Sequence, residues 1–417
     1  MTLFHIGKQE MMAEVKAGVK PVNSYLAAAL RLHSYLLMHH LEQQALVGPD
    51  PGVRFNYRIG RFVKSSLRKI DWRDRYYYLQ AQAYWVLANW SLFDMTQDVQ
   101  YRALAMNCAE TILLRQRDDG AWDYPNPEWK GRIATVEGAW AALGLLVAYQ
   151  RTRLPEYLTG ALRWHEYMVS HIGFQQIGDE LAVNYFAGRA QARVPNNATL
   201  VLILLARLAQ LTGERRYLEP AQGLLVFLQR AQLASGELPY AVGNSDNPGY
   251  YRQHLQCYQY NAFQCLELIA YYESTGDETA KAMVERLLPF LSQGLAADGH
   301  AYYDCSKPAR RVVYHAAALG AAFTQAGRIG LAGYDELAER AFGYVLASQR
   351  TDGGFWHSER DYRILADRRS YPRYLSMILL HLLMRAAVTV QPPTGIEPNA
   401  ARWSPESAVP SPMGIAA

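Results

Sequence analysis

The sequence predicts an all-α fold, an (α/α)6 toroid in which six helical hairpins close into a ring. Three observations predict it: a loop pattern with a nearly constant period, helical hydrophobic spacing inside each period, and apolar helices that alternate with amphipathic ones. A chain of 417 residues is also long for one simple core, which favours two domains or one large closed architecture.

The recurring pattern is a glutamine at a helix end, followed by a glycine-containing loop that carries an aromatic residue. Its copies begin at Gln116, Gln175, Gln232, Gln293 and Gln349. Successive copies are separated by 56 to 61 residues, and one more period towards the amino terminus reaches the aromatic loop at 55–57. A fixed period of this kind indicates repeated supersecondary units, here six.

Hydrophobic spacing inside the units predicts twelve helices, at 23–47, 72–95, 98–117, 135–152, 155–172, 196–213, 215–234, 255–275, 277–295, 312–328, 333–350 and 371–390. Short glycine turns such as 212–214 and 275–277 join helices on one side. Long loops fall on the other side, at 48–71, 118–134, 173–195, 235–254, 296–311 and 351–370. Loops of this length are usually functional, so we expect the site at their end of the ring.

The helices that follow the long loops are the more apolar set, as the segments 138–146, 200–205 and 316–322 illustrate. The helices that precede the loops are amphipathic, as at 335–342. A helix that is apolar all round is buried on all sides. The pattern therefore predicts six inner helices surrounded by six outer ones. An open helical solenoid is the alternative, but its repeats need not stop at six.

Charge and apolar segments restrict the classes of partner. The formal net charge is +4 without a basic run, so we expect no nucleic-acid partner. The first 22 residues lack a signal-peptide pattern, and the longest apolar segment, 138–149, is too short to span a bilayer. We therefore expect no transmembrane segment and a cytoplasmic location.

The cysteines and the two chain ends complete this outline. Cys108, Cys257, Cys265 and Cys305 have no metal-type spacing, and a disulfide framework is not expected. We therefore predict neither a cofactor nor a metal site. Residues 1–22 are expected to form an extension, 23–390 the toroid, and 391–417 a proline-rich disordered tail.

Tyrosine is unusually abundant, with 29 copies against 12 phenylalanines and 9 tryptophans. A phenol offers an apolar ring with one polar group, which suits stacking on sugars or lining a wet cavity. The stretch 252–264 opens a helix with one imidazole, two phenols and five amides. Such uncharged hydrogen-bonding groups indicate a helix end that lines a polar cavity, and the alternative is that they satisfy one another in a core. The expected partner is a small-molecule or glycan ligand.

Glu137 is the most suggestive carboxylate, because it begins an apolar helix. Burial would raise its pKa towards the range that suits a general acid. A glycosidase needs a second carboxylate, for which Asp123, Asp304 and Asp367 are candidates. The alternative is that Glu137 binds a helix amino end or an arginine.

His254 and Tyr258 are four residues apart and are expected to share one helix face. With Arg252 holding an acid group, this pair could abstract a proton beside a carboxylate, which is the chemistry of β-elimination or epimerisation of a uronate. The same aromatic groups could instead surround a carbocation. The catalytic candidates are therefore Glu137, His254 and Tyr258, and the substrate-binding candidates are Tyr77, Asp123, Trp140, Asn196, Asn197, Arg252, Tyr260, Asn261, Asp304, His315, Tyr371 and Arg373.

The Gln-x-x-x-Gly-x-Trp pattern at 116–122, with a longer variant at 349–356, resembles the repeat of the prenyltransferase and squalene-cyclase superfamily. In that superfamily the glutamine and tryptophan tie an outer helix to the next element, so the resemblance implies a structural role. The central Asp-x-Asp-Asp motif of triterpene cyclases and an Asp-Asp-x-x-Asp metal motif are both missing from this sequence.

A second resemblance is to alginate-lyase-like polysaccharide lyases and uronyl epimerases. Their Asn-Asn-His run is similar to Asn196-Asn197-Ala198, and their later arginine and tyrosine are similar to Arg252 and Tyr258. Ala198 departs from the pattern at the histidine, which His254 would have to replace. Asn196 and Asn197 also suit a helix cap after a proline.

Together these observations predict a carbohydrate-active enzyme that acts on a saccharide or a uronic-acid-containing glycan in a tyrosine-rich central cavity. The reaction class stays open between hydrolase, lyase and epimerase. One alternative is a terpenoid-cyclase-like enzyme without the Asp-x-Asp-Asp motif. Another is a non-catalytic saccharide-binding or scaffold toroid of polysaccharide biosynthesis.

Overall fold

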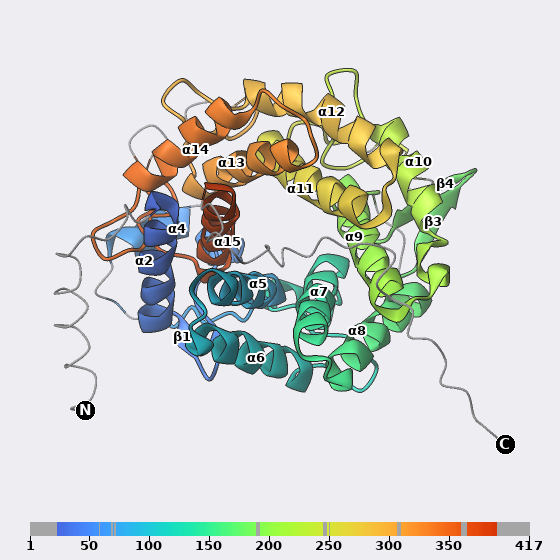
Figure 1. Ribbon diagram of the computed structural model, residues 1–417, viewed down its shortest axis with the longest axis horizontal. Coiled ribbons are helices and arrows are strands. Elements are labelled where there is room, and N and C mark those ends of the chain that lie inside the picture. Colours follow the sequence, from blue (N-terminus) through green and yellow to red (C-terminus); the bar gives the residue numbers. More distant parts are fainter. Residues whose placement is uncertain are drawn as a thin grey trace, which may run out of the picture.

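A computed structural model describes residues 23–57, 59–67, 70, 72–188, 192–244, 248–249, 251–306, 310–359 and 365–389. The predicted extension at 1–22 and the predicted tail at 391–417 lie outside these residues. The described part of the chain is an all-α toroid, as the sequence predicts (Figure 1).

In the described residues, six helices form the inner ring: α5 (Leu79–Thr96), α7 (Thr135–Thr152), α9 (Pro195–Thr212), α11 (Cys257–Thr275), α13 (Val313–Arg328) and α15 (Pro372–Thr389). Each inner helix packs against the next, and α15 packs against α5 (Figure 1). The ring is therefore closed, which rules out the open solenoid.

Six outer helices surround this ring within the described ranges: α2 (Ser24–His39), α6 (Val99–Leu114), α8 (Pro155–Tyr167), α10 (Ala221–Ala231), α12 (Glu278–Gln293) and α14 (Asp335–Ala347). Five of them follow their inner partner directly in the chain. The sixth, α2, packs against α15, so the last hairpin combines the first and last described helices. The predicted division into inner and outer helices is confirmed.

Burial separates the two sets of helices for the reason that the sequence suggests. In α13, every residue from Val313 to Ala326 is buried. Gly320 has no side chain, so the Phe342 ring of α14 packs directly against it, 2.9 Å from the position that a Cβ atom would occupy. In α14 the buried residues are Ala338, Ala341, Phe342 and Val345, which form one stripe. Inner helices thus bury most of their surface, whereas outer helices bury a single face.

The first outer helix and the first inner helix are shorter than predicted. The first outer helix ends at His39 instead of continuing to residue 47, and a short hairpin follows, β1 (Leu41–Glu42) and β2 (Ala45–Leu46). The Gln82 side chain holds that hairpin, because it accepts from the Leu46 amide at 2.8 Å and donates to the Leu46 carbonyl at 2.7 Å. The first inner helix begins at Leu79 rather than at residue 72.

Several predicted loops contain short elements. These are α3 (Arg54–Tyr57), α4 (Ile59–Ser66), the hairpin β3 (Phe174–Ile177) and β4 (Glu180–Val183), and the 3-10 turn Pro127–Trp129. Gln175 therefore lies on a strand instead of at a helix end. Two predicted helices contain other turns: the helix at 155–172 ends in a π-helical turn, Met168–Ile172, and the helix at 215–234 begins with a 3-10 turn, Arg215–Leu218. In the described chain, no helix has the length and apolarity that crossing a bilayer requires.

Three of the five predicted glutamines form what we call glutamine clamps. Gln116, Gln232 and Gln349 each donate from Nε2 to the carbonyl of the glycine four residues later, at 2.8 to 3.0 Å. Each also donates to a carbonyl of the next outer helix, at Gly160, Met283 and Ala28 respectively. The clamps fix the long loops against the outer ring, a structural role that agrees with the one expected.

Candidate functional site

A polar cavity of about 250 Å³ lies at the amino-terminal ends of the inner helices. All six inner helices and several long loops contribute to its wall. Its described lining residues are Gly52, Gln80, Tyr124, Val136, Glu137, Trp140, Tyr185, Val194, Asn196, Asn197, Tyr240, Gln256, Gln259, Tyr260, Phe263, Glu267, Tyr314, Arg373, Tyr374 and Met377. The long loops and the inner-helix tips therefore share one face, as expected.

Glu137 is held rigidly in this wall. Its Oε2 accepts hydrogen bonds from the backbone amides of Leu79 at 2.7 Å and Gln80 at 3.3 Å, at the start of α5. Its Oε1 accepts no hydrogen bond from the described residues, which leaves that oxygen available to a ligand. Burial raises the pKa of Glu137 to about 7, although Arg373 and the two amides oppose the rise. The carboxyl thus binds a helix amino end and also faces the cavity.

Arg373 is the one cation among the described residues that line the cavity. Its Nη2 lies 2.8 Å from Oδ2 of Asp50, a buried residue of the loop after β2. The same guanidinium donates to the Tyr374 hydroxyl at 2.7 Å and lies 4.3 Å from the Tyr78 ring centroid. Burial raises the pKa of Asp50, and the charge of Arg373 opposes that rise. The positive charge of Arg373 is therefore balanced by a fixed partner.

Six tyrosines supply most of the aromatic surface: Tyr124, Tyr185, Tyr240, Tyr260, Tyr314 and Tyr374. Ring centroids are 4.2 Å apart for Tyr314 and Tyr374, and 5.1 Å apart for Tyr240 and Tyr260. Burial raises the pKa of Tyr185, Tyr260 and Tyr374 above the usual value for a phenol. These phenols stay protonated at neutral pH and can donate hydrogen bonds to a ligand.

Side-chain amides complete the polar wall. Oδ1 of Asn196, Nδ2 of Asn197 and Oε1 of Gln259 are buried without a hydrogen-bond partner among the described residues. Buried polar atoms are normally satisfied, so these atoms are available to water or to a bound ligand. Val194 is the residue that caps α9, and no side-chain hydrogen bond closes that helix end. The capping role considered for Asn196 and Asn197 is therefore not what the structure shows.

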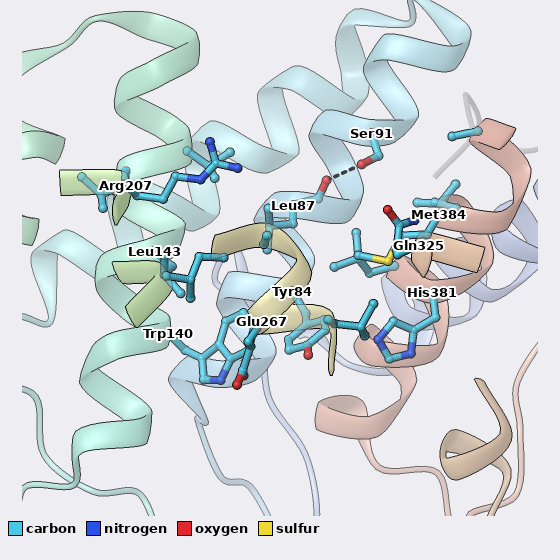
Figure 2. Close-up of a pocket in the computed structure, with 18 of the residues that line it drawn as sticks. Tyr84, Leu87, Ser91, Trp140, Leu143, Arg207, Glu267, Gln325, His381 and Met384 are labelled. Atoms are coloured by element: carbon cyan, nitrogen blue, oxygen red, sulfur yellow. Dashed lines mark hydrogen bonds between the residues drawn. The ribbon is translucent and has the colours of Figure 1, made fainter. Parts of the chain in front are cut away.

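A second cavity, of about 490 Å³, lies further along the axis among the later turns of the inner helices. Trp140, Phe263 and Glu267 line both cavities and so lie between them. Figure 2 shows Tyr84, Trp140, Glu267 and His381 together at one end of this space. Much of the remaining wall is apolar, with Leu87, Leu143, Leu146, Val147, Ile203, Leu266, Leu383 and Met384.

Glu267 is a functional candidate that the sequence analysis missed. Its Oε2 accepts a hydrogen bond of 2.5 Å from the Thr199 hydroxyl, and burial raises its pKa to about 8. The carboxyl is thus protonated at neutral pH. A single carboxylate inside the apolar run Cys265–Ala270 was the available signal. Asp50 was also missed, because nothing in its local sequence points to Arg373.

The proposed proton-abstracting group is not assembled at the cavity. His254 is exposed, and its Nδ1 lies 2.9 Å from Oε2 of Glu237. Arg252 is also exposed, and its guanidinium lies 5.5 Å from the Tyr240 ring centroid. Tyr258 stacks on Phe290 at 5.0 Å and does not line the cavity. The physical reason is that α11 begins only at Cys257, so His254 precedes the helix and does not share a face with Tyr258.

Other predicted binding residues have structural contacts instead. Asn261 accepts from the Leu238 amide at 2.7 Å and donates to the Leu238 carbonyl at 2.9 Å, which fixes a loop. Tyr371 donates to Asp367 at 2.8 Å. Asp123 is exposed and pairs with Arg117 at 3.0 Å.

Three further predicted residues also lie outside the cavity wall. Asp304 accepts from the Ser306 amide at 2.9 Å, the Tyr77 ring lies 3.9 Å from the Arg115 guanidinium, and His315 stacks on Tyr303 at 5.3 Å. The predicted residues that the structure brings together are Glu137, Trp140, Asn196, Asn197, Tyr260 and Arg373. None of the three aspartates considered as a second carboxylate lines the cavity.

No protein-family model matches the sequence, and no curated protein does either. The prenyltransferase-like repeat therefore has no support from a family match. Among solved structures, a possible family GH105 member from Salmonella enterica is similar, with 13% identity and a TM-score of 0.66 over 89% of this chain and 97% of that one. A family 76 glycoside hydrolase from Bacteroides thetaiotaomicron has 14% identity and a TM-score of 0.63 over 88% of this chain and 79% of that one.

A cellobiose 2-epimerase from Bacillus thermoamylovorans is also similar, with 15% identity and a TM-score of 0.61 over 79% of this chain and all of that one. A polysaccharide lyase has the same arrangement at 11% identity, with a TM-score of 0.62. At these identities the likeness concerns the fold. The chain shares its (α/α)6 toroid with glycoside hydrolases, a polysaccharide lyase and a sugar epimerase.

Proposed function

We propose that the protein is a carbohydrate-active enzyme that binds a saccharide in the polar cavity and uses Glu137 as its acid–base group. One observation carries this proposal: a buried carboxyl with a pKa of about 7 presents a free oxygen to a cavity of phenols and unpartnered amides. A pKa near the working pH allows a group both to take and to return a proton. Phenols and amides are suited to sugar hydroxyls and sugar rings.

Charge in the wall favours a neutral saccharide over a uronate. Arg373 is already paired with Asp50, and Glu137 contributes either no charge or a negative one. A ligand carboxylate would therefore find no unpaired cation among the described lining residues. Desolvating such a carboxylate without a counter-charge is costly.

The carboxyl groups also favour proton transfer over hydrolysis. A two-carboxylate glycosidase needs one group ionised while the other stays protonated. Here burial raises the pKa of Glu137 to about 7 and that of Glu267 to about 8, so neither has the low pKa of a resting nucleophile. A single group that exchanges protons near pH 7 suits isomerisation or epimerisation of a reducing sugar. Neighbours of the same fold include a cellobiose 2-epimerase and a D-mannose isomerase.

In this reaction the ionised Glu137 takes the proton from the carbon beside the sugar carbonyl, and a cavity phenol donates a hydrogen bond to the carbonyl oxygen. The electrons of the broken C–H bond form a carbon–carbon double bond, and the negative charge moves to the former carbonyl oxygen, which gives an enediolate held by the phenol hydrogen bond. For the isomer, the proton of the adjacent hydroxyl passes to the former carbonyl oxygen, and Glu137 returns its proton to the former carbonyl carbon. For the epimer, Glu137 keeps the abstracted proton, a second group donates a proton to the opposite face of the original carbon, and exchange with solvent restores both groups. The second outcome needs a donor on that face, for which protonated Glu267 is the candidate.

The test is incubation with neutral reducing sugars, glycosides and uronate oligomers in deuterated water, followed by nuclear magnetic resonance and mass spectrometry. We expect an isomer or epimer of a neutral sugar that carries deuterium beside the carbonyl. Cleavage of glycosides, or unsaturated products from uronates, would instead assign hydrolysis or elimination. Binding without turnover of any sugar would favour the non-catalytic alternative. Glu128→Gln, a change at an exposed carboxylate outside the cavity, is the matched control.

The pH dependence gives an independent prediction. As a general base, Glu137 must be ionised, so kcat/KM is expected to rise with pH along a curve with a midpoint of about 7. A glycosidase that used Glu137 as its general acid would lose activity over the same interval. Initial rates between about pH 5 and pH 9 show whether kcat/KM rises or falls with pH. A flat profile would remove Glu137 from the rate-determining proton transfer.

The second cavity favours one other candidate, an enzyme that protonates an unsaturated prenyl chain. It is largely apolar, and the protonated carboxyl of Glu267 lies at one end beside the aromatic rings of Tyr84, Trp140 and Phe263. Incubation with linear prenyl substrates tests it. Cyclised products that disappear in Glu267→Gln would establish this function, whereas unchanged prenyl chains would exclude it.

A further inference from the structure

A second cluster of chemically active side chains lies outside both cavities, at the amino-terminal end of α11. His254 belongs to the loop before the helix, Cys257 is its first residue, and Cys305 belongs to the loop between α12 and α13. Their potential ligand atoms all lie within 4.8 Å of one another, and the two sulfur atoms are 3.3 Å apart. Long-range folding thus joins three side chains that the cysteine spacing does not reveal.

We propose that His254, Cys257 and Cys305 bind a thiophilic divalent cation, with Zn²⁺ as the best match. Zinc binds thiolate sulfur at about 2.3 Å and imidazole nitrogen at about 2.0–2.1 Å in tetrahedral sites, which places ligand atoms roughly 3.5–4 Å apart. The sulfur–sulfur distance of 3.3 Å and the upper limit of 4.8 Å for all the ligand atoms bracket this spacing. Shifts on the order of 1 Å or less in exposed side chains close the geometry.

Glu237 supplies the outer contact that such a histidine needs. Its side chain is only 1% exposed, and its oxygens lie 2.9 and 3.1 Å from Nδ1 of His254. A carboxylate on Nδ1 fixes the tautomer and leaves the lone pair of Nε2 for a cation, as in carboxylate–histidine–zinc arrangements.

The charge and proton balance of binding is simple. Both thiols lose their protons to solvent, the imidazole stays neutral, and two thiolates cancel the charge of the divalent ion. The exposed side of the cluster leaves a fourth position for water, since His254 and Cys305 are exposed while Cys257 is buried. No oxidant or reductant takes part.

The ion would connect two neighbouring hairpins and fix a strained turn. Gln256 lies between two of the ligands and has a φ of 44°, a left-handed conformation that non-glycine residues rarely adopt. Gln256 also lines the polar cavity. The cation would therefore hold this turn, and with it one polar side chain of the cavity wall.

The test uses the full-length protein, purified without a histidine tag or chelating resin. We expect elemental analysis to find about one zinc per chain, and cobalt added to chelator-treated protein to give a thiolate-to-cobalt charge-transfer band. Zinc alone should restore the melting temperature that chelation lowers. Cys257→Ser, Cys305→Ser and His254→Ala should each abolish the cobalt band.

The chain offers its own matched controls, since Cys108 and Cys265 are free and buried and do not belong to the cluster. Cys108→Ser and Cys265→Ser should keep the band. Glu237→Gln keeps all three ligands and should weaken zinc affinity by about 10–100-fold. Failure of folded protein to bind zinc or cobalt, a disulfide between Cys257 and Cys305 found by mass spectrometry, or equal loss in the control variants would each overturn the proposal.

Discussion

Replacement of Glu137 by glutamine is expected to lower turnover of the saccharide by about 10²–10⁴-fold. The amide cannot take or return a proton at neutral pH, so the acid–base contribution is lost while the shape is kept. The glutamine oxygen can still accept the amide hydrogen bonds of Leu79 and Gln80, so the start of α5 stays closed. Steady-state kinetics should show the loss in kcat with a smaller change in KM.

The melting temperature of the same variant shows whether it is folded. Glu137→Gln should melt at or above the wild-type temperature at pH 8, because it removes a buried carboxylate whose ionisation burial opposes. Glu128→Gln should change neither kcat nor stability, since Glu128 is exposed and outside the cavity. Retention of turnover within a few-fold of wild type in Glu137→Gln would contradict an acid–base role.

Replacement of Asp50 by alanine is expected to reduce the free energy of unfolding by about 3–5 kcal/mol, the usual effect of removing one partner of a buried ion pair. Asp50 is 1% exposed, and Arg373 would keep its charge in the cavity wall without a counter-ion. Denaturant-induced unfolding followed by circular dichroism measures the change. The variant should also bind saccharide poorly, because Tyr374 and Tyr78 contact the same guanidinium.

Two comparisons make this prediction specific. Combining Asp50→Ala with Arg373→Met should recover most of the lost stability, because the uncompensated charge is then gone. Asp123→Ala removes one of the two carboxylates that pair with Arg117 at the surface, where exposed ion pairs contribute only about 0.2–1 kcal/mol. Equal destabilisation by Asp50→Ala and Asp123→Ala would show that Asp50 is not an essential partner of Arg373.

The ring itself could be predicted because its cause is local and repeated. Inner helices bury most of their surface and outer helices bury one stripe, as α13 and α14 show, and clamps such as Gln116 and Gln349 mark the period. Glu137 could be found for a similar reason, since a carboxylate that begins an apolar helix must be buried with it. Asn196 and Asn197 followed from their place at an inner-helix tip.

The features of the two sites that could not be predicted depend on contacts between distant parts of the chain. Asp50 meets Arg373 only when the ring closes, and Cys257 meets Cys305 only when two neighbouring hairpins dock. The pairing of His254 with Tyr258 assumed helical spacing, which fails because the helix begins at Cys257. Sequence periodicity predicts which face of a helix is buried, but it does not predict where the helix begins within one turn.

The last glutamine clamp has a consequence for how the chain is made. Gln349 holds Ala28 of α2, and α2 completes its hairpin with α15, so the earliest described helix lacks these two contacts until the last described helix has been synthesised. During synthesis its apolar stripe must stay soluble, a task that suits a ribosome-associated chaperone. A circularly permuted gene that begins before α15 and continues through a linker into α2 would produce both halves of that hairpin consecutively, and should fold with less aggregation as it emerges.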